Sequence, residues 1–140
     1  MSVIVSDAGF APEDWNFGFV ALEALDGTDA ASALAVDVHS DADAAELGER
    51  LGAIDLIRID FPSSANGRGF TIARRLRAMG YQGRLRAAGH VLADQYAMAR
   101  RVGFDEIEIS DELAARQPED QWRFRAEDWR DHDYQSRLRA

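Results

Sequence analysis

The chain has 140 residues, of which 46% are hydrophobic, so it carries enough apolar surface for one core and is not expected to be disordered throughout. It contains no cysteine, which excludes disulfides, a thiolate nucleophile, zinc sites built from cysteine and iron–sulfur clusters held by its own thiolates. The net charge of −9 argues against general binding to nucleic acid or anionic membranes, because both need clustered cations.

The N-terminal residues predict neither a targeting segment nor a membrane span. The opening stretch, MSVIVSDAGF, has no basic region followed by an apolar one, and the apolar stretch FGFVALEAL is interrupted by Glu23. We therefore expect a cytoplasmic protein that contacts no membrane and no nucleic acid. Residues 1–32 predict a segment that covers the core, with a short edge strand at residues 3–5.

From residue 33 onward, strand and helix patterns alternate along the chain. In chain order, the predicted elements are strand 33–38, helix 41–51, strand 54–61, helix 70–79, strand 83–88, helix 91–102, strand 105–109 and helix 111–116. Ser40 and Ser110 stand where N-caps of two of these helices are expected. The alternation predicts right-handed βαβ crossovers and a parallel sheet, in a single domain whose core spans residues 33–117.

The predicted strands have one apolar face and one charged face. The apolar face carries Leu34, Val36, Val38, Ile57, Ile59, Phe61, Leu85, Ala87, Ile107 and Ile109. The opposite face carries Asp37, Arg58, Asp60, Arg84, Arg86, Glu106 and Glu108. Parallel strands are usually buried on both faces, so this pattern predicts an α/β fold with a part-barrel or half-barrel sheet, a TIM-barrel-like fragment with a charged concave side. An open Rossmann-like sheet is the alternative.

The charges along the chain are unevenly distributed. Residues 1–52 carry a net charge of −10, residues 53–103 carry +6, and residues 104–140 carry −5. Two interpretations of this basic middle region stay open. Its arginines form a structural ladder with neighbouring carboxylates, or they face a ligand at the C-terminal ends of the strands, where parallel α/β folds bind ligands.

The stretch FPSSANGRGF, residues 61–70, lies at such a strand end and predicts a site for a small anionic ligand. Glycines allow a close backbone approach, and an arginine near a helix N-terminus offers a charged fork to a carboxylate, sulfate or phosphate. The candidate ligand-binding residues are Asn66, Gly67, Arg68, Gly69, Arg58, Arg86, Gly89 and Gln95. The motif lacks the last glycine of the dinucleotide fingerprint, and we expect neither a cofactor nor a metal.

A second hypothesis assigns acid–base chemistry to the same end of the sheet. The candidate catalytic residues are Asp60, His90 and Asp94, because a histidine beside an acid suits proton transfer near neutral pH. Capping or solvated roles for His90 and Asp94 remain open as the alternative. Whether the chain is an enzyme is not decided by these residues.

The segment from residue 61 to 104 resembles the bacterial family called domain of unknown function 934. The resemblance rests on many fixed spacings, carried by Phe61, Pro62, Gly67, Arg68, Phe70, Thr71, Ala73, Arg74, Leu76, Arg77, Gly83, Leu85, Arg86, Ala87, Gly89, Val91, Asp94, Gln95, Gly103 and Phe104. Two departures, Asn66 and His90, stand where the family usually has aspartate. Both remove a carboxylate from the loop end, which argues that this chain does not share any metal or acid–base role that is common to the family.

The resemblance implies a role in sulfur assimilation. Members of the family are often encoded beside sulfite reductase and the reductase for activated sulfate, and they carry the label of probable oxidoreductases in sulfite reduction. We therefore expect an accessory protein that binds a small anionic metabolite, docks on one of these reductases, or does both. An acid–base enzyme and a purely structural interaction module are the alternatives.

The tail at residues 118–140 mixes aromatic and charged residues. Trp122, Phe124, Trp129 and Tyr134 either cover the domain's own core or anchor a partner. A second copy of the chain is one candidate partner. Four or five βα units leave a barrel incomplete, and a homodimer would cover the remaining edge.

Overall fold

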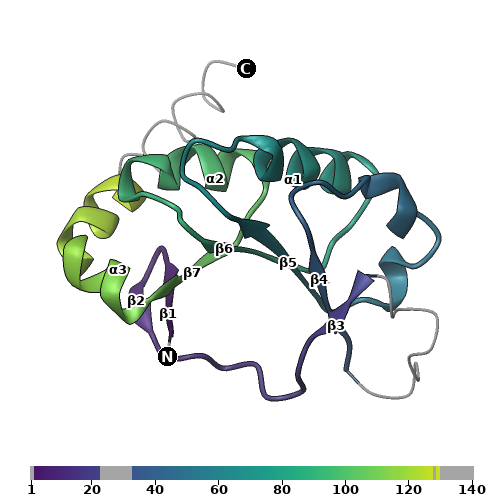
Figure 1. Ribbon diagram of the computed structural model, residues 1–140, viewed down its shortest axis with the longest axis horizontal. Coiled ribbons are helices and arrows are strands. Elements are labelled where there is room, and N and C mark those ends of the chain that lie inside the picture. The colour runs from purple at the N-terminus through teal and green to yellow at the C-terminus, as the bar shows by residue number, and fades with distance from the viewer. Residues whose placement is uncertain (1, 23–32, 128, 130–140) are drawn as a thin grey trace.

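The structure, a computed structural model, describes residues 2–22, 33–127 and 129. Its centre is a curved seven-stranded sheet in the order β2-β1-β7-β6-β5-β4-β3 (Figure 1). The strands are β1 (Ser2–Ser6), β2 (Gly9–Ala11), β3 (Val20–Ala21), β4 (Ala35–Val38), β5 (Leu56–Phe61), β6 (Arg84–Gly89) and β7 (Glu106–Ser110). Strands β3 to β7 are parallel, whereas β1 runs antiparallel to both β2 and β7.

The helices lie mainly on one side of this sheet. They are α1 (Arg68–Ala78), α2 (Tyr96–Val102), α3 (Asp111–Arg116) and a further helix over residues 119–127, with 3-10 turns η2 (Ala44–Leu47), η3 (Leu51–Ala53) and η4 (Ala93–Gln95). Helices α1 and α2 cover the convex face of the sheet (Figure 1). In the described part of the chain, no helix has the length and apolar character that crossing a membrane requires.

The architecture confirms the predicted α/β fold with a half-barrel sheet, which is curved but open. Strands β4 to β7 are the four predicted from alternation, and helix α3 has the predicted bounds. The Ser110 hydroxyl accepts a hydrogen bond from the Leu113 backbone N–H at 3.1 Å and so caps α3 as expected. The predicted N-terminal edge strand lies inside the sheet, because β2 pairs along its outer side.

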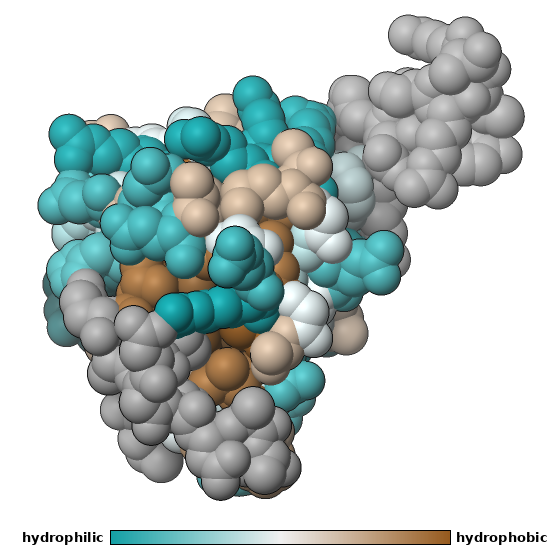
Figure 2. Space-filling model, turned by 90° about the vertical axis from the view of Figure 1, so that its right-hand side faces the viewer, coloured by the Kyte–Doolittle hydropathy of each residue, from teal (hydrophilic) through white to brown (hydrophobic). Residues whose placement is uncertain are grey.

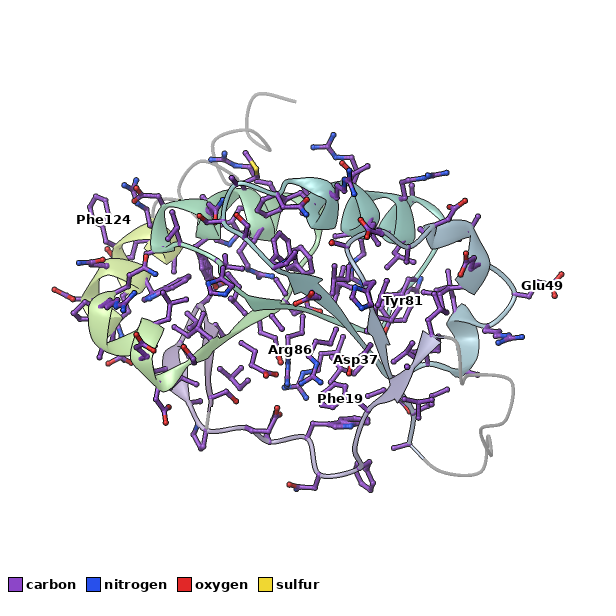
Figure 3. All side chains as sticks on the ribbon, viewed as in Figure 1. Phe19, Asp37, Glu49, Tyr81, Arg86 and Phe124 are labelled. Carbon is purple, nitrogen blue, oxygen red and sulfur yellow. The ribbon has the colours of Figure 1, made fainter. Side chains whose placement is uncertain are left out.

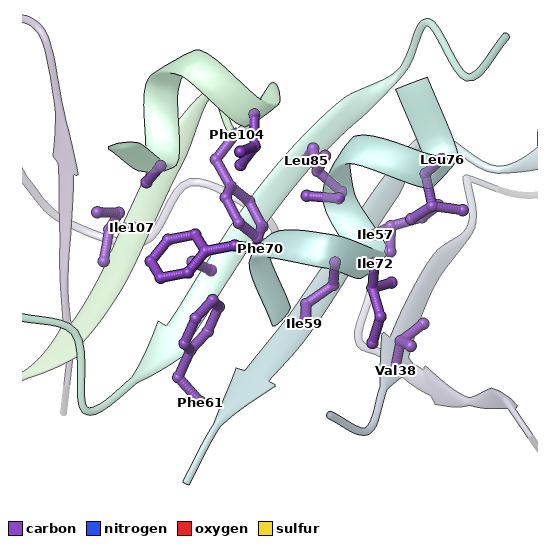
Figure 4. Packing of buried hydrophobic residues seen from close by; sticks show 14 of the residues in the cluster. Val38, Ile57, Ile59, Phe61, Phe70, Ile72, Leu76, Leu85, Phe104 and Ile107 are labelled. Carbon is purple, nitrogen blue, oxygen red and sulfur yellow. The ribbon is translucent and has the colours of Figure 1, made fainter. Parts of the chain in front are cut away.

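The apolar face of the strands forms the core together with α1 and α2. Figure 4 shows Ile57, Ile59 and Leu85 of the sheet packed under Leu76 and Ile72 of α1. All of these side chains are buried. At the C-terminal end of the strands, Phe61, Phe70 and Phe104 meet edge to face. The ring of Phe61 lies 5.0 Å from that of Phe70 and 5.8 Å from that of Phe104.

The prediction of a helix at residues 41–51 was wrong, because the structure has two 3-10 turns in this region. Asp43 caps the first turn, since its carboxylate accepts the Ala45 N–H at 3.0 Å, so Ser40 is not the cap. Gly48 follows this turn, and a glycine disfavours continuation of an α-helix. The buried residues Leu47 and Leu51 still anchor the segment to the core. Likewise, the helix predicted from residue 91 begins with η4, and α2 itself starts at Tyr96.

The sheet has two ends of different character. At one end, the β1–β2 hairpin closes the parallel strands with an antiparallel pair. At the other end lies β3, and that side of the molecule shows apolar residues at the surface, framed by hydrophilic side chains (Figure 2). Residues 12–19, which we call the strap, run from β2 to β3 across the concave side of the sheet (Figure 1).

Candidate functional site

The concave face carries ionisable side chains in two rows that cross the strands. Register places Asp37, Arg58, Arg86 and Glu106 side by side on β4 to β7, and Asp60, Ala88 and Glu108 in the next row. Because side chains alternate along a strand, all of these point away from the helices. Figure 3 shows Arg86 and Asp37 in the space between the sheet and the strap, close to Phe19 of the strap.

Arg58 is held by one carboxylate from the neighbouring strand β4 and one from β7, two strands away on the other side of β5. Its Nε and Nη2 donate to the two Asp37 oxygens at 2.6 and 2.9 Å, and its Nη1 donates to Glu108 at 3.1 Å. The Phe19 ring stacks over the guanidinium, with the ring centroid 3.5 Å from Cζ. Burial lowers the pKa of Arg58, but the bonds and charges of Asp37 and Glu108 outweigh burial and raise it.

Arg86 is fully buried and is held by three carboxylates. Its Nε donates to Glu106 at 2.6 Å, and its Nη1 donates to Glu108 at 2.8 Å. Glu13 of the strap accepts from both terminal nitrogens, at 2.5 Å from Nη1 and 2.9 Å from Nη2. Burial opposes the charge of Arg86, but the bonds to Glu13 and Glu106 raise its pKa above the usual value.

The strap contributes a second carboxylate one residue further on. Asp14 accepts from Nη2 of Arg84 at 2.5 Å, while Glu106 accepts from Nε and Nη2 of the same arginine at 2.7 and 2.9 Å. The bond to Arg84 lowers the pKa of Asp14. Burial raises the pKa of Glu13, but the contacts with Arg86 outweigh burial and lower it. Both strap carboxylates are therefore ionised in the folded protein at neutral pH.

The network as a whole is acidic, although the middle of the chain is basic. Three arginines at positions 58, 84 and 86 meet five carboxylates at positions 13, 14, 37, 106 and 108. The balance is thus two negative charges. The ladder of ion pairs that the sequence left open as one interpretation is present on this face. An anion that approaches it meets arginines that already have carboxylate partners.

A cavity of about 600 Å³ opens beside this network at the C-terminal ends of the strands. It is lined by Ala21, Asp37, Val38, His39, Arg58, Asp60, Ala88, Gly89 and Glu108. The space exists because Ala88, which sits between Asp60 and Glu108 in the second row, has a small side chain, and the next residue, Gly89, has none. Glu108 joins the cavity to the buried network, because it contacts both Arg58 and Arg86.

Two titratable side chains at the rim of the cavity are exposed. His39 directly follows β4, and Asp60 is the neighbouring position on β5, since Val38 pairs with Ile59. Neither side chain has a hydrogen-bond or ion-pair partner among residues 2–22, 33–127 and 129. The same part of the chain has no group of three histidine or carboxylate side chains placed to hold a metal ion.

The predicted site residues are divided between several places. Arg58, Asp60 and Gly89 line the cavity, and Arg86 lies next to it through Glu108. Arg68 lies elsewhere, in a shallow cavity of about 300 Å³ beside α1, where it pairs with Asp41. His90 lines a third cavity, and Asp94 pairs with Arg125 at 2.8 Å on the outer surface.

The remaining candidates of the loop hold the local structure together. The Asn66 side chain accepts the Arg68 backbone N–H at 3.0 Å at the start of α1. Gln95 donates to the Ser64 carbonyl at 2.8 Å and accepts the Leu92 N–H at 2.9 Å, so it ties this loop to the next one. The backbone at Gly89 has φ +117°, and an added Cβ would lie 2.5 Å from the Phe61 carbonyl oxygen. That position therefore needs glycine.

The two glycines around Arg68 differ in a way that can be tested. An added Cβ on Gly69 would lie 2.4 Å from Cζ of the buried Phe61 ring, whereas one on Gly67 would meet no atom within 4 Å. We expect Gly69→Ala to lower the free energy of unfolding by about 1–3 kcal/mol through overpacking. Gly67→Ala should cost less than about 1 kcal/mol. Urea denaturation of both variants measures the difference, and equal losses would contradict the packing described here.

Sequence reasoning missed three residues that the structure brings to the site. His39 lies two residues after Asp37, so both belong to the same face of a strand. Extending strand 33–38 by one residue would have placed His39 on the charged face. Glu108 was assigned to that face but not to a site. Glu13 gives no signal in the sequence, because it reaches Arg86 across 73 positions of the chain.

Comparison with known proteins gives one match. A family model described as a bacterial protein of unknown function (DUF934) matches residues 35–140, which include β4 to β7 and every strand residue of the cavity from Asp37 onward. The strap lies before the matched residues. No match was found among curated proteins or among solved structures.

Proposed function

Since the chain belongs to the bacterial family DUF934, whose function is unknown, we propose its function from the concave face: it binds a small polar metabolite in the cavity between β4 and β7. The observation that carries the proposal is the cavity itself. Its volume of about 600 Å³ lies within the range of small-molecule sites, and it sits at the C-terminal ends of parallel strands. Charged side chains and small residues line it together.

The charges of the lining indicate how a ligand is held. Among the described residues, Arg58 is the only arginine that lines this cavity, and Asp37 and Glu108 already contact it. Asp60 offers a carboxylate without a partner in the described part of the chain. A ligand with a hydrogen-bond donor or a cationic group therefore gains a contact at Asp60 at no cost to existing pairs. A simple anion has no such contact at this rim.

The metabolic setting of the proposal follows from the family resemblance. We propose an accessory protein of assimilatory sulfate or sulfite reduction, whose ligand belongs to that chemistry and whose partner is a sulfite or activated-sulfate reductase. Docking on a reductase and formation of a homodimer stay predictions. The Arg68 cavity, where Arg68 pairs with Asp41 and Arg75 lies 3.8 Å from Asp43, is the place on the described surface where the predicted small anion would bind instead.

Acid–base chemistry in the same cavity is the second candidate function. The observation in its favour is the pair of exposed, unpartnered side chains at the rim, His39 and Asp60, on adjacent strands. A histidine beside a carboxylate is suited to proton transfer near neutral pH. In this version Asp60 keeps its predicted role, and His39 takes the place that the sequence assigned to His90.

A ligand panel with matched variants tests the proposal. The panel contains sulfate, sulfite, adenosine phosphosulfates, nucleotides, NADPH, FMN and divalent metals, each at low and high chloride. At a hundredfold excess over its Kd, the right compound should raise the melting temperature by about 5 °C or more. Ala88→Leu fills the cavity and should abolish this shift, whereas Ala115→Leu, on the exposed side of α3, should retain it.

The outcomes separate the alternatives. A shift that survives Ala88→Leu but disappears in Arg68→Ala would move the ligand site to the cavity beside α1 and overturn the proposal. If the stabilising compound is consumed, and if Asp60→Asn and His39→Gln bind it but no longer convert it, the second candidate function is correct. A compound that binds without turnover supports binding alone.

A further inference from the structure

The strap is attached to the concave face by side chains alone. Residues 12–19 make no backbone–backbone hydrogen bond with the residues that the structure describes. Side chains of the strap contact three arginines of the sheet. Glu13 pairs with Arg86, and Asp14 pairs with Arg84 and lies 3.7 Å from Arg86. Phe19 stacks on Arg58 and lies 5.8 Å from the guanidinium of Arg86. Phe17 points outward, with 68% of its surface exposed. The strap can therefore leave the face without disrupting a strand or a helix.

Glu13 occupies the place of a ligand on Arg86. Its two oxygens meet the two terminal nitrogens of the guanidinium, which is the bidentate arrangement that arginine forms with carboxylates and other oxyanions. The sheet itself supplies two further acceptors. Glu106 accepts from Nε, and Glu108 accepts from Nη1. The outer edge of Arg86 is thus the only part of this buried cation that the sheet leaves to the strap.

Departure of the strap changes the charge balance of the face. With the strap in place, the three arginines meet five carboxylates. Without Glu13 and Asp14, they meet only Asp37, Glu106 and Glu108, so the face becomes neutral. The outer edge of Arg86 would then have only water as a partner, and an oxyanion from solution would form charge-assisted, bidentate hydrogen bonds there.

We propose that Arg86 is a latent oxyanion site and that the strap keeps it closed, with the Glu13 carboxylate in the position that an oxyanion of the ligand takes when the strap is displaced. The ligand class is a metabolite with a carboxylate, sulfate, sulfite or phosphate group. This inference deepens the proposed function and rests on it, because the site adjoins the cavity through Glu108. The ligand spans both, with its oxyanion at Arg86 and a donor group at Asp60.

Inorganic oxyanions test this site without knowledge of the metabolite. A tethered carboxylate competes at an effective concentration on the order of millimolar, so the probe must exceed it. We would compare melting temperatures in sodium sulfate, phosphate and acetate with those in sodium chloride of equal ionic strength. Glu13→Gln keeps the shape of the strap and the charge of Asp14 but removes the charge of Glu13. Glu112→Gln is the matched control, since Glu112 pairs with Arg116 on the exposed side of α3.

Glu13→Gln should gain more stability from an oxyanion than the wild type does. We expect an additional rise of about 3 °C or more in at least one of the three salts, relative to chloride. Glu112→Gln should respond as the wild type, and Glu13→Gln combined with Arg86→Met should lose the gain. The salt that acts at the lowest concentration distinguishes sulfate-like, phosphate-like and carboxylate groups. Equal responses in Glu13→Gln and the wild type would overturn the proposal.

A second measurement decides the matter if Glu13→Gln does not fold. Trp15 lies in the strap, where its indole donates to the Gly18 carbonyl at 2.8 Å and its ring meets Phe17 at 5.2 Å. In the wild type, the effective oxyanion should change the Trp15 fluorescence along a saturable curve that chloride does not produce. The change should be absent in Trp15→Phe.

A flat Trp15 signal up to the highest oxyanion concentration would overturn the proposal. If the metabolite panel fails while this curve is present, the oxyanion site stands and the assigned ligand is wrong.

Discussion

Replacement of Arg86 by methionine should lower the free energy of unfolding at pH 7 by about 3–5 kcal/mol, which is the usual cost of removing one partner from a buried ion pair. Methionine fills much of the same space but leaves Glu13, Glu106 and Glu108 without this cation. Glu106 keeps Arg84 and Glu108 keeps Arg58, so the loss should fall toward the lower end of that range. Chemical denaturation measures it.

Arg84→Met is the matched control for this loss. Arg84 is partly exposed, and its strap partner Asp14 is 65% exposed, so solvent screens the pair. The control should therefore cost clearly less than Arg86→Met. Glu13→Gln placed on top of Arg86→Met should recover part of the stability, because it removes one of the unpaired carboxylates. If Arg86→Met costs no more than Arg84→Met, the account of Arg86 as the buried centre of the network is wrong.

The loss in Arg86→Met should also depend on pH in a defined direction. In the wild type, the pKa of Glu13 in the folded state lies below its ordinary value of 4.5. A lowered carboxyl pKa contributes stability that is fully present above about pH 4.5 and is lost as pH falls through the folded-state pKa. At every pH, Arg86→Met lacks the part of this contribution that comes from Arg86, while the bond from the Trp15 backbone N–H to Glu13 remains. The stability curves of the variant and the wild type should therefore approach each other below pH 4.5.

Trp122→Ala should destabilise the protein by about 3–5 kcal/mol, as truncations of large buried aromatic residues do. Trp122 is 1% exposed, and its ring meets that of Tyr96 edge to face at 6.2 Å. Its indole N–H donates to the Gln117 carbonyl at 2.9 Å, which would lose its partner. A loss of this size in Trp122→Ala would support the prediction that the aromatic residues of the tail cover the domain's own core.

Phe124→Ala is the control within the same helix. Phe124 is 63% exposed and points away from the body of the protein (Figure 3), so its removal should change stability by less than about 0.5 kcal/mol. Urea denaturation of both variants gives the comparison. Similar small losses would mean that residues 119–127 are not part of the core. Tyr134 lies outside the described residues, so its predicted role stays untested.

The sequence predicted the two faces of the sheet because their cause is local. Successive side chains of a strand point to opposite sides, so alternation of Ile57, Arg58, Ile59 and Asp60 assigns each residue without knowledge of its neighbours. The burial of the apolar members and the position of the charged members follow that assignment. The prediction of a helix at residues 41–51 was wrong. Its residue pattern suits a helix, but Gly48 and the Asp43 cap favour short turns.

The site itself was only partly predictable, because it depends on contacts between distant residues. Arg58, Asp60 and Gly89 were placed at the cavity because they end neighbouring parallel strands. Glu13 could not be paired with Arg86 in advance, since no periodicity links an irregular segment to a strand far along the chain. His90 lies outside the cavity for a local reason. The left-handed backbone of Gly89 interrupts the alternation, so His90 leaves the concave face.

The measurement that tests the central claim most directly is the mapping of backbone amide NMR shifts during titration with the compound that stabilises the protein most in the ligand panel. If the concave cavity is the ligand site, the largest shifts will cluster at His39, Asp60, Ala88 and Gly89. The α1 amides near the second cavity, such as that of Thr71, will stay in place. The opposite pattern, with shifts along α1 and none at the strand ends, would contradict the assignment of function to the concave face.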